Sequence, residues 1–367
     1  MNEQDKKTYS NFEYDSALNV QEGVKQPEQI SNFYLENMRI KKRSEPSVEE
    51  MVDGILHGDR VMLSRAITLV ESSRFDHRTK AQQVIEQCLP YSGKSVRLGI
   101  TGVPGAGKST TIEALGKMLT ALNHKVAVLA IDPSSERSKG SILGDKTRME
   151  ELSTDPNAFI RPSPSAGSLG GVARKTREII ILCEAAGFDT VIVETVGVGQ
   201  SEVAAHSMVD FFLLLQLANT GDELQGIKRG IMEMADMIAI NKSDIDIDKS
   251  KLAAQQFRNA LHLFPMPDSQ WTVPVVLCSA YSKMGLQEIW NTVLEYVAFT
   301  KQNGYFYHKR QEQNLRILDE TIENTLKERF YNQPGMEERI EQIRKEILEN
   351  KVSAYSAAEK LVNSCDQ

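Results

Sequence analysis

The sequence contains few cysteines and histidines, no long apolar run and no excess of basic residues. Its 4 cysteines lie far apart and form no C-x-x-C pair, which is typical of free thiols in a reducing compartment. Its 6 histidines are scattered, so there is no metal-storage tract. No apolar run reaches the roughly 18 residues that cross a bilayer, and the acidic first residues resemble neither a secretory signal nor a transit peptide. We therefore expect a cytoplasmic protein without a membrane partner.

The absence of a basic excess also limits the possible partners. The formal net charge is −7 and the sequence pI is about 5.6. Nothing in such a chain offsets repulsion from the phosphates of DNA or RNA, so no nucleic-acid partner is expected and any phosphate site must be built locally. Apolar residues make up 41% of the 367 positions, which is enough for a sizeable buried core.

Composition and spacing divide the chain into four parts. Residues 1–46 are polar without a sustained period, and we expect them to form a mobile tail. A capping-box pattern at Ser47–Glu50 and the helically spaced apolar residues after it predict a helical region over 47–94. Residues 95–300 alternate between strand and helix patterns, and 301–367 return to helical patterns.

The C-terminal part carries two amphipathic stripes. The first contains Leu315, Leu318, Ile322, Leu326 and Phe330, and the second, after a break at Pro334-Gly335, contains Ile340, Ile343 and Ile347. Two such helices at a chain end either pack back on the domain or pair with a second copy. The pattern alone leaves both arrangements open.

The middle part predicts an α/β fold. Short, nearly continuous apolar runs separated by helix-length segments are typical of strands buried on both faces of a parallel sheet. These runs are Val96–Ile100, Val126–Ile131, Thr190–Val193, Phe211–Leu217, Met237–Ile240 and Val273–Leu277. The predicted fold is a doubly wound, mostly parallel sheet whose ligands bind at the carboxyl ends of the strands.

A phosphate-binding loop follows the first of these strands. The segment Gly102-Val-Pro-Gly-Ala-Gly-Lys-Ser109 fits the pattern G-x-x-x-x-G-K-[ST]. Its glycines let backbone N–H groups wrap a phosphate, and the helix expected to start near Lys108 adds its N-terminal N–H groups and dipole. Lys108 supplies a cation to the β- and γ-phosphates, and the Ser109 hydroxyl can bind Mg²⁺.

A guanine-binding motif follows the strand Met237–Ile240. In Asn241-Lys-Ser-Asp244, the Asp244 carboxylate can accept both donors of the guanine edge, and adenine would leave it unpaired. Lys242 can lay its aliphatic stem over the base, and Asn241 can brace the loop. One strand later, a backbone N–H in the loop that begins at Ser279 can bond the guanine O6 atom.

Acidic residues lie where the carboxyl edge of the sheet is expected. Asp132 and Glu194 directly follow buried strands, and Asp145 lies in the loop after the second strand. Oxygen ligands of this kind suit Mg²⁺. Glu194-Thr-Val-Gly197 is a Glu variant of the D-x-x-G switch, in which the Gly197 N–H can sense the γ-phosphate and Gln200 can orient water.

Six strings, taken in order, carry a resemblance to a known family. They are G-V-P-G-A-G-K-S-T at Gly102–Thr110, I-D-P-S-S at Ile131–Ser135, G-S-I-L-G-D-K-T-R-M at Gly140–Met149, S-L-G-G at Ser168–Gly171, V-E-T-V-G-V-G-Q-S-E at Val193–Glu202 and N-T-G-D-E-L-Q-G-I-K at Asn219–Lys228. The chain resembles the MeaB/MMAA/ArgK family of P-loop GTPases, the methylmalonyl-CoA mutase accessory proteins. The resemblance runs from about residue 47 to beyond residue 350.

This resemblance implies a fold and a role that spacing does not show. The fold would be a SIMIBI-type G domain between N-terminal helices and C-terminal dimerisation helices. The protein would be a homodimeric chaperone of an adenosylcobalamin-dependent acyl-CoA mutase. Its binding and hydrolysis of GTP would gate cofactor loading and protect the mutase.

The motifs and the resemblance together give the predicted site. The nucleotide-binding residues are Gly102, Val103, Pro104, Gly105, Ala106, Gly107, Lys108, Ser109, Thr110, Gly197, Asn241, Lys242, Asp244, Ser279, Ala280, Tyr281 and Ser282. The catalytic residues are Lys108, Glu194 and Gln200, and the Mg²⁺ ligands are Ser109, Asp132, Asp145 and Glu194. The loop Asn219–Lys228 matches the family's extra switch, which relays the nucleotide state to the mutase.

Two other functions use a similar P-loop. A nickel- or other cofactor-delivery GTPase of related fold would favour a His-rich tract or clustered Cys and His, and this sequence has neither. A P-loop small-molecule kinase would mostly use ATP, which the guanine motif disfavours. The ratio of GTP to ATP affinity distinguishes a GTPase from the kinase. Capture of a mutase subunit distinguishes the mutase chaperone from the delivery GTPase.

Overall fold

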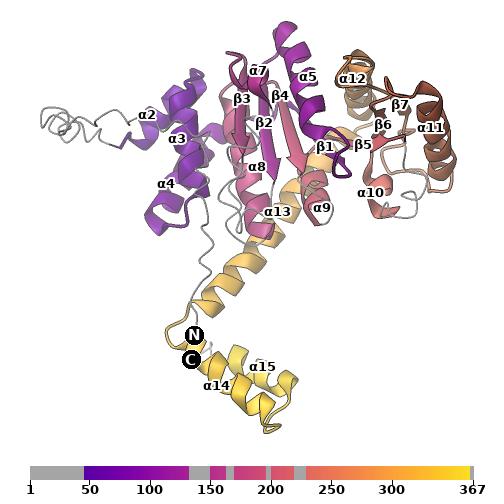
Figure 1. Cartoon of the computed structure of the whole chain (residues 1–367). Coiled ribbons are helices and arrows are strands. Elements are labelled where there is room, and N and C mark those ends of the chain that lie inside the picture. The colour runs from indigo at the N-terminus through magenta and orange to yellow at the C-terminus, as the bar shows by residue number, and fades with distance from the viewer. Residues whose placement is uncertain (1–44, 132–148, 163–168, 196–199, 219–228, 364–367) are drawn as a thin grey trace, which may run out of the picture. The chain divides into compact units, whose positions relative to one another are not determined.

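The structure is a computed structural model that describes residues 45–131, 149–162, 169–195, 200–218 and 229–363 (Figure 1). The chain divides into two units, Met1–Pro46 and Ser47–Gln367, and all the helices and strands given below belong to the second. The tail predicted at 1–46 therefore lies almost entirely outside the described residues. Among the helices that are described, none is both long and apolar enough to cross a membrane.

In the described part of the chain, three helices precede the sheet. They are α2 (Val48–Leu56), α3 (Arg60–Glu71) and α4 (Phe75–Cys88), followed by the single 3₁₀ turn η1 (Leu89–Tyr91). The predicted capping box is confirmed, because the Ser47 hydroxyl accepts from the Glu50 amide at 3.1 Å and the Glu50 carboxylate accepts from the Ser47 amide at 2.8 Å. The buried side chains of all three helices join those of α8 (Leu169–Ala185) in one apolar cluster.

Within the described residues, seven parallel strands form one sheet in the order β3-β2-β4-β1-β5-β6-β7. They are β1 (Val96–Gly102), β2 (Val126–Ile131), β3 (Ala158–Pro162), β4 (Thr190–Thr195), β5 (Phe211–Leu217), β6 (Met237–Asn241) and β7 (Val275–Leu277). The predicted doubly wound fold is confirmed. The strands β2 and β4 are buried along their whole length, which explains their continuous apolar sequences.

The six predicted strands are all present, and one strand was missed. The missed strand, β3, lies at the edge of the sheet, is only half buried over its second half and ends in Pro162, so its sequence lacks a sustained apolar run. The last strand begins at Val275 and not at Val273 as predicted.

Helices cover both faces of the sheet. On one face, α5 (Lys108–Ala121) and α12 (Leu286–Gln302) pack against alternate residues of β1 and β5. The other face carries α8 and α9 (Gln200–His206) and, beyond β5, α10 (Arg229–Met234) and α11 (Ile247–Leu261). The short α7 (Glu150–Ser153) precedes β3 and packs with α5.

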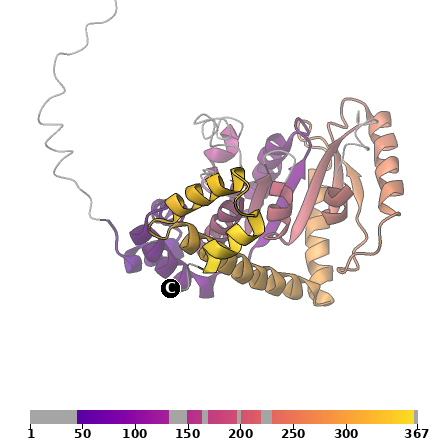
Figure 2. The ribbon, with the colours of Figure 1, turned by 90° about the horizontal axis from the view of Figure 1, so that it is seen from below.

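A long helix, α13 (Tyr305–Tyr331), begins beside the amino ends of β1 and β5, and Figure 2 shows it along one side of the sheet. The Lys309 ammonium donates to the Asp210 carbonyl at 2.8 Å, and the Arg310 guanidinium donates to both oxygens of the Asp210 carboxylate. The predicted break occurs at Gly335, before α14 (Met336–Leu348). A further helix that the sequence pattern did not predict, α15 (Ala354–Asn363), follows it.

The Glu184 carboxylate on α8 joins the start of β1 to the helix layer. It accepts from the Gly93 amide at 2.6 Å, the Ser95 hydroxyl at 2.6 Å and the Arg97 guanidinium at 2.8 and 2.9 Å. Its side chain is 1% exposed. Removing one partner from such a buried pair leaves an uncompensated charge.

We predict that Glu184→Gln lowers the free energy of unfolding by about 3 kcal/mol. The matched control is Glu341→Gln, which breaks the Arg344–Glu341 pair whose side chains are 67% and 56% exposed. It should change the same quantity by less than about 0.5 kcal/mol. Urea denaturation measures both, and equal effects in the two variants would contradict the structural role of Glu184.

Candidate nucleotide site

The predicted phosphate loop lies between the end of β1 at Gly102 and the start of α5 at Lys108. Two of its glycines have no room for a side chain. A Cβ atom at Gly102 would lie 2.4 Å from the Leu215 carbonyl oxygen of β5, and one at Gly107 would lie 2.7 Å from the Asn241 amide nitrogen. Gly107 also has a φ of 89°, which L side chains rarely adopt. The loop conformation therefore depends on glycine at both positions.

The Lys108 ammonium lies over this loop. It donates to the Gly102 carbonyl at 2.8 Å and to the Val103 carbonyl at 3.4 Å. Burial lowers the pKa of Lys108, and the charges of Glu194 and Glu202 oppose that shift. A half-buried cation in a loop of glycine-enabled amides is a local arrangement suited to a phosphate group.

The Ser109 hydroxyl donates to the Glu194 carboxylate at 2.9 Å. Adjacent ligands of an octahedral Mg²⁺ ion, each about 2.1 Å from the metal, lie about 3 Å apart. The two oxygens therefore have the separation of neighbouring ligands. In the part of the chain that the structure describes, no group of three or more His, Cys, Asp or Glu side chains could hold a metal.

Several predicted site residues lie outside the described residues. These are Asp132, Asp145 and Gly197, together with the whole predicted switch loop Asn219–Lys228. Gln200 begins α9, but its side chain is not described. Their predicted roles stay predictions.

Glu202 is a residue that sequence analysis did not single out. It lies in the first turn of α9, is fully buried, and its charge acts on Lys108. The sequence signal that could have identified it is an acidic residue in the first turn of α9, directly after the switch motif.

The predicted guanine motif begins at Asn241, the last residue of β6. Asn241 is 2% exposed, whereas the side chains of Lys242 and Asp244 are exposed to solvent. Lys242 has a φ of 59°, so the backbone turns sharply after the strand. The Ser243 amide donates to the Cys278 carbonyl at 3.0 Å, which holds the motif against the segment after β7.

The Asn241 side chain connects three loops. Its amide nitrogen donates to the Ala106 carbonyl of the phosphate loop at 2.7 Å. Its amide oxygen accepts from the Ala280 amide at 3.1 Å. The side chain thus braces the loops, as the sequence predicted, and its buried polar atoms are used within the protein.

The loop 279–282 lies beside the guanine motif. The amides of Ser279, Ala280 and Ser282 donate to the Met284 carbonyl, the Asn241 side chain and the Ser279 hydroxyl, respectively. Among the described residues the Tyr281 amide has no partner, and the Tyr281 side chain is 89% exposed. The Tyr281 amide is therefore the one in this loop that is available to a ligand.

Comparison with known proteins places this geometry in a family. The family model described as methylmalonyl Co-A mutase-associated GTPase MeaB matches residues 63–335. The chain is 46% identical over 292 residues to the GTPase ArgK of Escherichia coli, covering 79% of this chain and 88% of that protein. It is 44% identical over 328 residues to the mitochondrial methylmalonic aciduria type A homolog of Mus musculus, covering 86% and 79%.

A solved structure shows the same fold. The crystal structure titled LAO/AO transport system kinase is 36% identical, has a TM-score of 0.70, and covers 87% of this chain and 98% of that chain. The matched residues include the phosphate loop, the guanine motif and the whole of α13. The chain therefore belongs to the MeaB family of P-loop GTPases.

Proposed function

We propose that this chain binds GTP with Mg²⁺ across the two loops, hydrolyses it to GDP and phosphate, and acts as a chaperone of an adenosylcobalamin-dependent acyl-CoA mutase of the methylmalonyl-CoA mutase type. The observation that supports the nucleotide site best is the Asn241 side chain, which joins the phosphate loop to the guanine motif at the same edge of the sheet. The names of the family and of the mouse relative support the mutase as the partner.

In this proposal the P-loop residues hold the triphosphate. The amides of Gly102–Thr110 surround the phosphates, and Lys108 moves from the loop carbonyls to the phosphate oxygens. Ser109 and Glu194, with Asp132 and Asp145, hold the metal directly or through water. Bound Mg²⁺ supplies positive charge to the β- and γ-phosphate oxygens. Gly197 and Gln200 act at the γ-phosphate and the attacking water.

The base is selected by hydrogen bonds to its edge. The exposed Asp244 carboxylate accepts the two guanine donors, Lys242 covers the ring, and the Tyr281 amide is free to donate to O6. The nucleotide then gates loading of the cofactor on the mutase, and this gating protects the mutase from inactivation.

The parts of the chain have separate roles in this proposal. Residues 47–94 form the N-terminal helical region, 95–300 the G domain and 301–367 the region that pairs with a second copy. The support for a homodimer is a stripe of exposed apolar side chains along α13, which we call the α13 stripe. It consists of Leu315, Leu318, Ile322 and Leu326, which are 63%, 55%, 49% and 59% exposed.

We predict that Asp244→Asn weakens GTP binding at least about 100-fold and improves binding of xanthosine triphosphate, because the amide donates where the carboxylate accepts. Isothermal titration with both nucleotides measures the change. The control Asp248→Asn alters another exposed carboxylate in the first turn of α11 and should leave both affinities unchanged. A variant that keeps the GTP preference would refute the role of Asp244.

We also predict that the double substitution Leu318→Glu/Ile322→Glu converts a dimer into a monomer, because charges replace the centre of the α13 stripe. Multi-angle light scattering at micromolar concentration measures the mass. The control Leu263→Glu places the same charge at a residue that is 80% exposed and lies outside the stripe. A monomeric unsubstituted protein would overturn the dimer.

The chaperone role predicts slow GTP hydrolysis by the isolated protein, because a regulated GTPase reaches its full rate only when a partner completes the site. Adding an adenosylcobalamin-dependent mutase should raise the rate at least about tenfold. Phosphate release measures it, with Lys108→Ala as a variant that should stay inactive in both conditions. Rapid hydrolysis without the mutase, or no response to it, would contradict the proposed role.

A further inference from the structure

The segment 200–210, which contains α9 and the four residues before β5, leads from the candidate nucleotide site to the amino end of β5. It follows β4, whose carboxyl end carries Glu194, and leads into β5, whose amino end contacts α13. A crossover helix between parallel strands must return the chain across the sheet. The first turn of α9 therefore lies near the phosphate loop, where the charge of Glu202 acts on Lys108. Its last turn lies near α13.

One buried guanidinium joins this last turn to α13. The Arg177 side chain on α8 is 7% exposed, and it donates to the Ser207 hydroxyl at 2.7 Å and to the Glu320 carboxylate at 2.6 Å. Ser207 directly follows α9, and its hydroxyl donates to the Ala204 carbonyl at 2.7 Å. The two bonds come from different nitrogens of the planar guanidinium, a geometry that the single nitrogen of lysine does not reproduce.

The acceptor on α13 is held as an anion. Burial raises the pKa of Glu320, but hydrogen bonds from Arg177 and Arg316 outweigh it and hold the pKa below its usual value. The Arg316 guanidinium donates to the second oxygen of Glu320 at 3.1 Å. The link between α8 and α13 is thus charge-assisted, and such bonds are stronger than neutral ones.

The rest of the segment after α9 is also fixed to α13. The Gln313 amide donates to the Val209 carbonyl at 2.9 Å, and Lys309 donates to the Asp210 carbonyl. Burial lowers the pKa of His206 to about 3, with Lys309 and Arg316 adding to the shift, so this ring packs against Phe212 as a neutral group. A shift of α9 along its axis therefore moves α13 or breaks the Arg177 bonds.

We infer that Arg177 is a positioning residue that couples α9 to α13. Through it, binding of the nucleotide at the P-loop and binding of a second copy of the chain at the α13 stripe change each other's affinity. This inference rests on the proposed GTP site. Coupling of this kind is reciprocal: if GTP changes the affinity of the stripe for a second copy, that copy changes the affinity for GTP by the same factor. Glu320 projects inward from the same turns of α13 that carry Leu318 and Ile322 outward.

Hydrogen exchange on the full chain tests the coupling. The protein is compared with GDP and with a non-hydrolysable GTP analogue, in the presence of Mg²⁺. In the unsubstituted protein, amides of residues 316–326 should differ at least about fivefold in exchange rate between the two states. In Ser207→Ala and in Glu320→Ala the difference should fall by at least about half, because each substitution cuts the Arg177 connection from one side while the Gln313 and Lys309 bonds remain.

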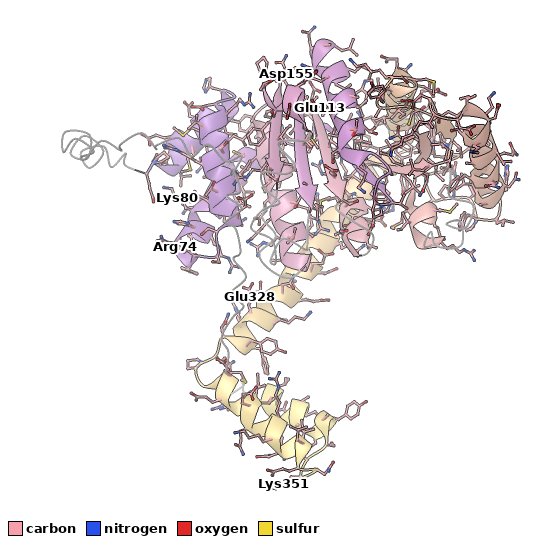
Figure 3. The ribbon with its side chains drawn as sticks, viewed as in Figure 1. Arg74, Lys80, Glu113, Asp155, Glu328 and Lys351 are labelled. Atoms are coloured by element: carbon pink, nitrogen blue, oxygen red, sulfur yellow. The ribbon has the colours of Figure 1, made fainter. Side chains whose placement is uncertain are left out.

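The matched control is Glu328→Ala, which breaks a different ion pair of α13. Glu328, labelled in Figure 3, lies 3.3 Å from the Arg78 guanidinium of α4. This variant should keep the nucleotide-dependent difference at 316–326. An unchanged melting temperature shows that a variant is folded. A GDP affinity within about twofold of that of the unsubstituted protein shows that it still binds nucleotide.

The outcomes separate the inference from the proposed function. Nucleotide-dependent protection at residues 102–110 without any response at 316–326 would overturn the coupling alone. An undiminished response in both Ser207→Ala and Glu320→Ala would do the same for the role of Arg177. No protection at 102–110 with either nucleotide would overturn the GTP site, and the coupling with it.

Discussion

The hydrogen bonds of the Asn241 side chain are the interaction on which the rest of the candidate site depends. Its amide donates to the Ala106 carbonyl in the phosphate loop and accepts from the Ala280 amide beside the guanine motif. A carboxamide offers a donor and an acceptor at once, and an aspartate would leave the Ala106 carbonyl without its donor. Because the side chain is 2% exposed, these bonds are shielded from water. They fix the spacing between the two loops before a ligand arrives, which reduces the ordering cost of binding.

The parallel sheet has two edges with different contacts, one at the carboxyl ends and one at the amino ends of its strands. Its carboxyl edge carries the phosphate loop, Glu194 and the guanine motif, since parallel strands bring their following loops together. Its amino edge carries α13, held by Lys309 and Arg310 on Asp210. Each strand runs from one edge to the other, and each crossover segment returns the chain. The segment 200–210 therefore connects the two edges, and the Arg177 bonds join its end to α13.

Much of this architecture could be predicted from the sequence because its signals are local. The continuous apolar strands, the capping box at Ser47 and the phosphate loop depend on residues within a few positions of one another. The strand β3 was missed because it is a half-exposed edge strand that ends in proline. The partners of Asn241 could not be predicted, since Ala106 lies 135 residues away, and neither could the Arg177–Glu320 pair, which spans 143 residues. Such contacts appear only once the sheet order is known.

In the proposed complex, one nucleotide occupies both loops with Asn241 between them. A crystal structure of the protein grown with a non-hydrolysable GTP analogue and Mg²⁺ tests it most directly. We predict that the phosphates lie against Gly102–Ser109, that the guanine edge lies on Asp244, and that the Asn241 bonds to Ala106 and Ala280 stay intact. A nucleotide bound elsewhere, or a bound nucleotide with Asn241 detached from Ala106, would contradict it.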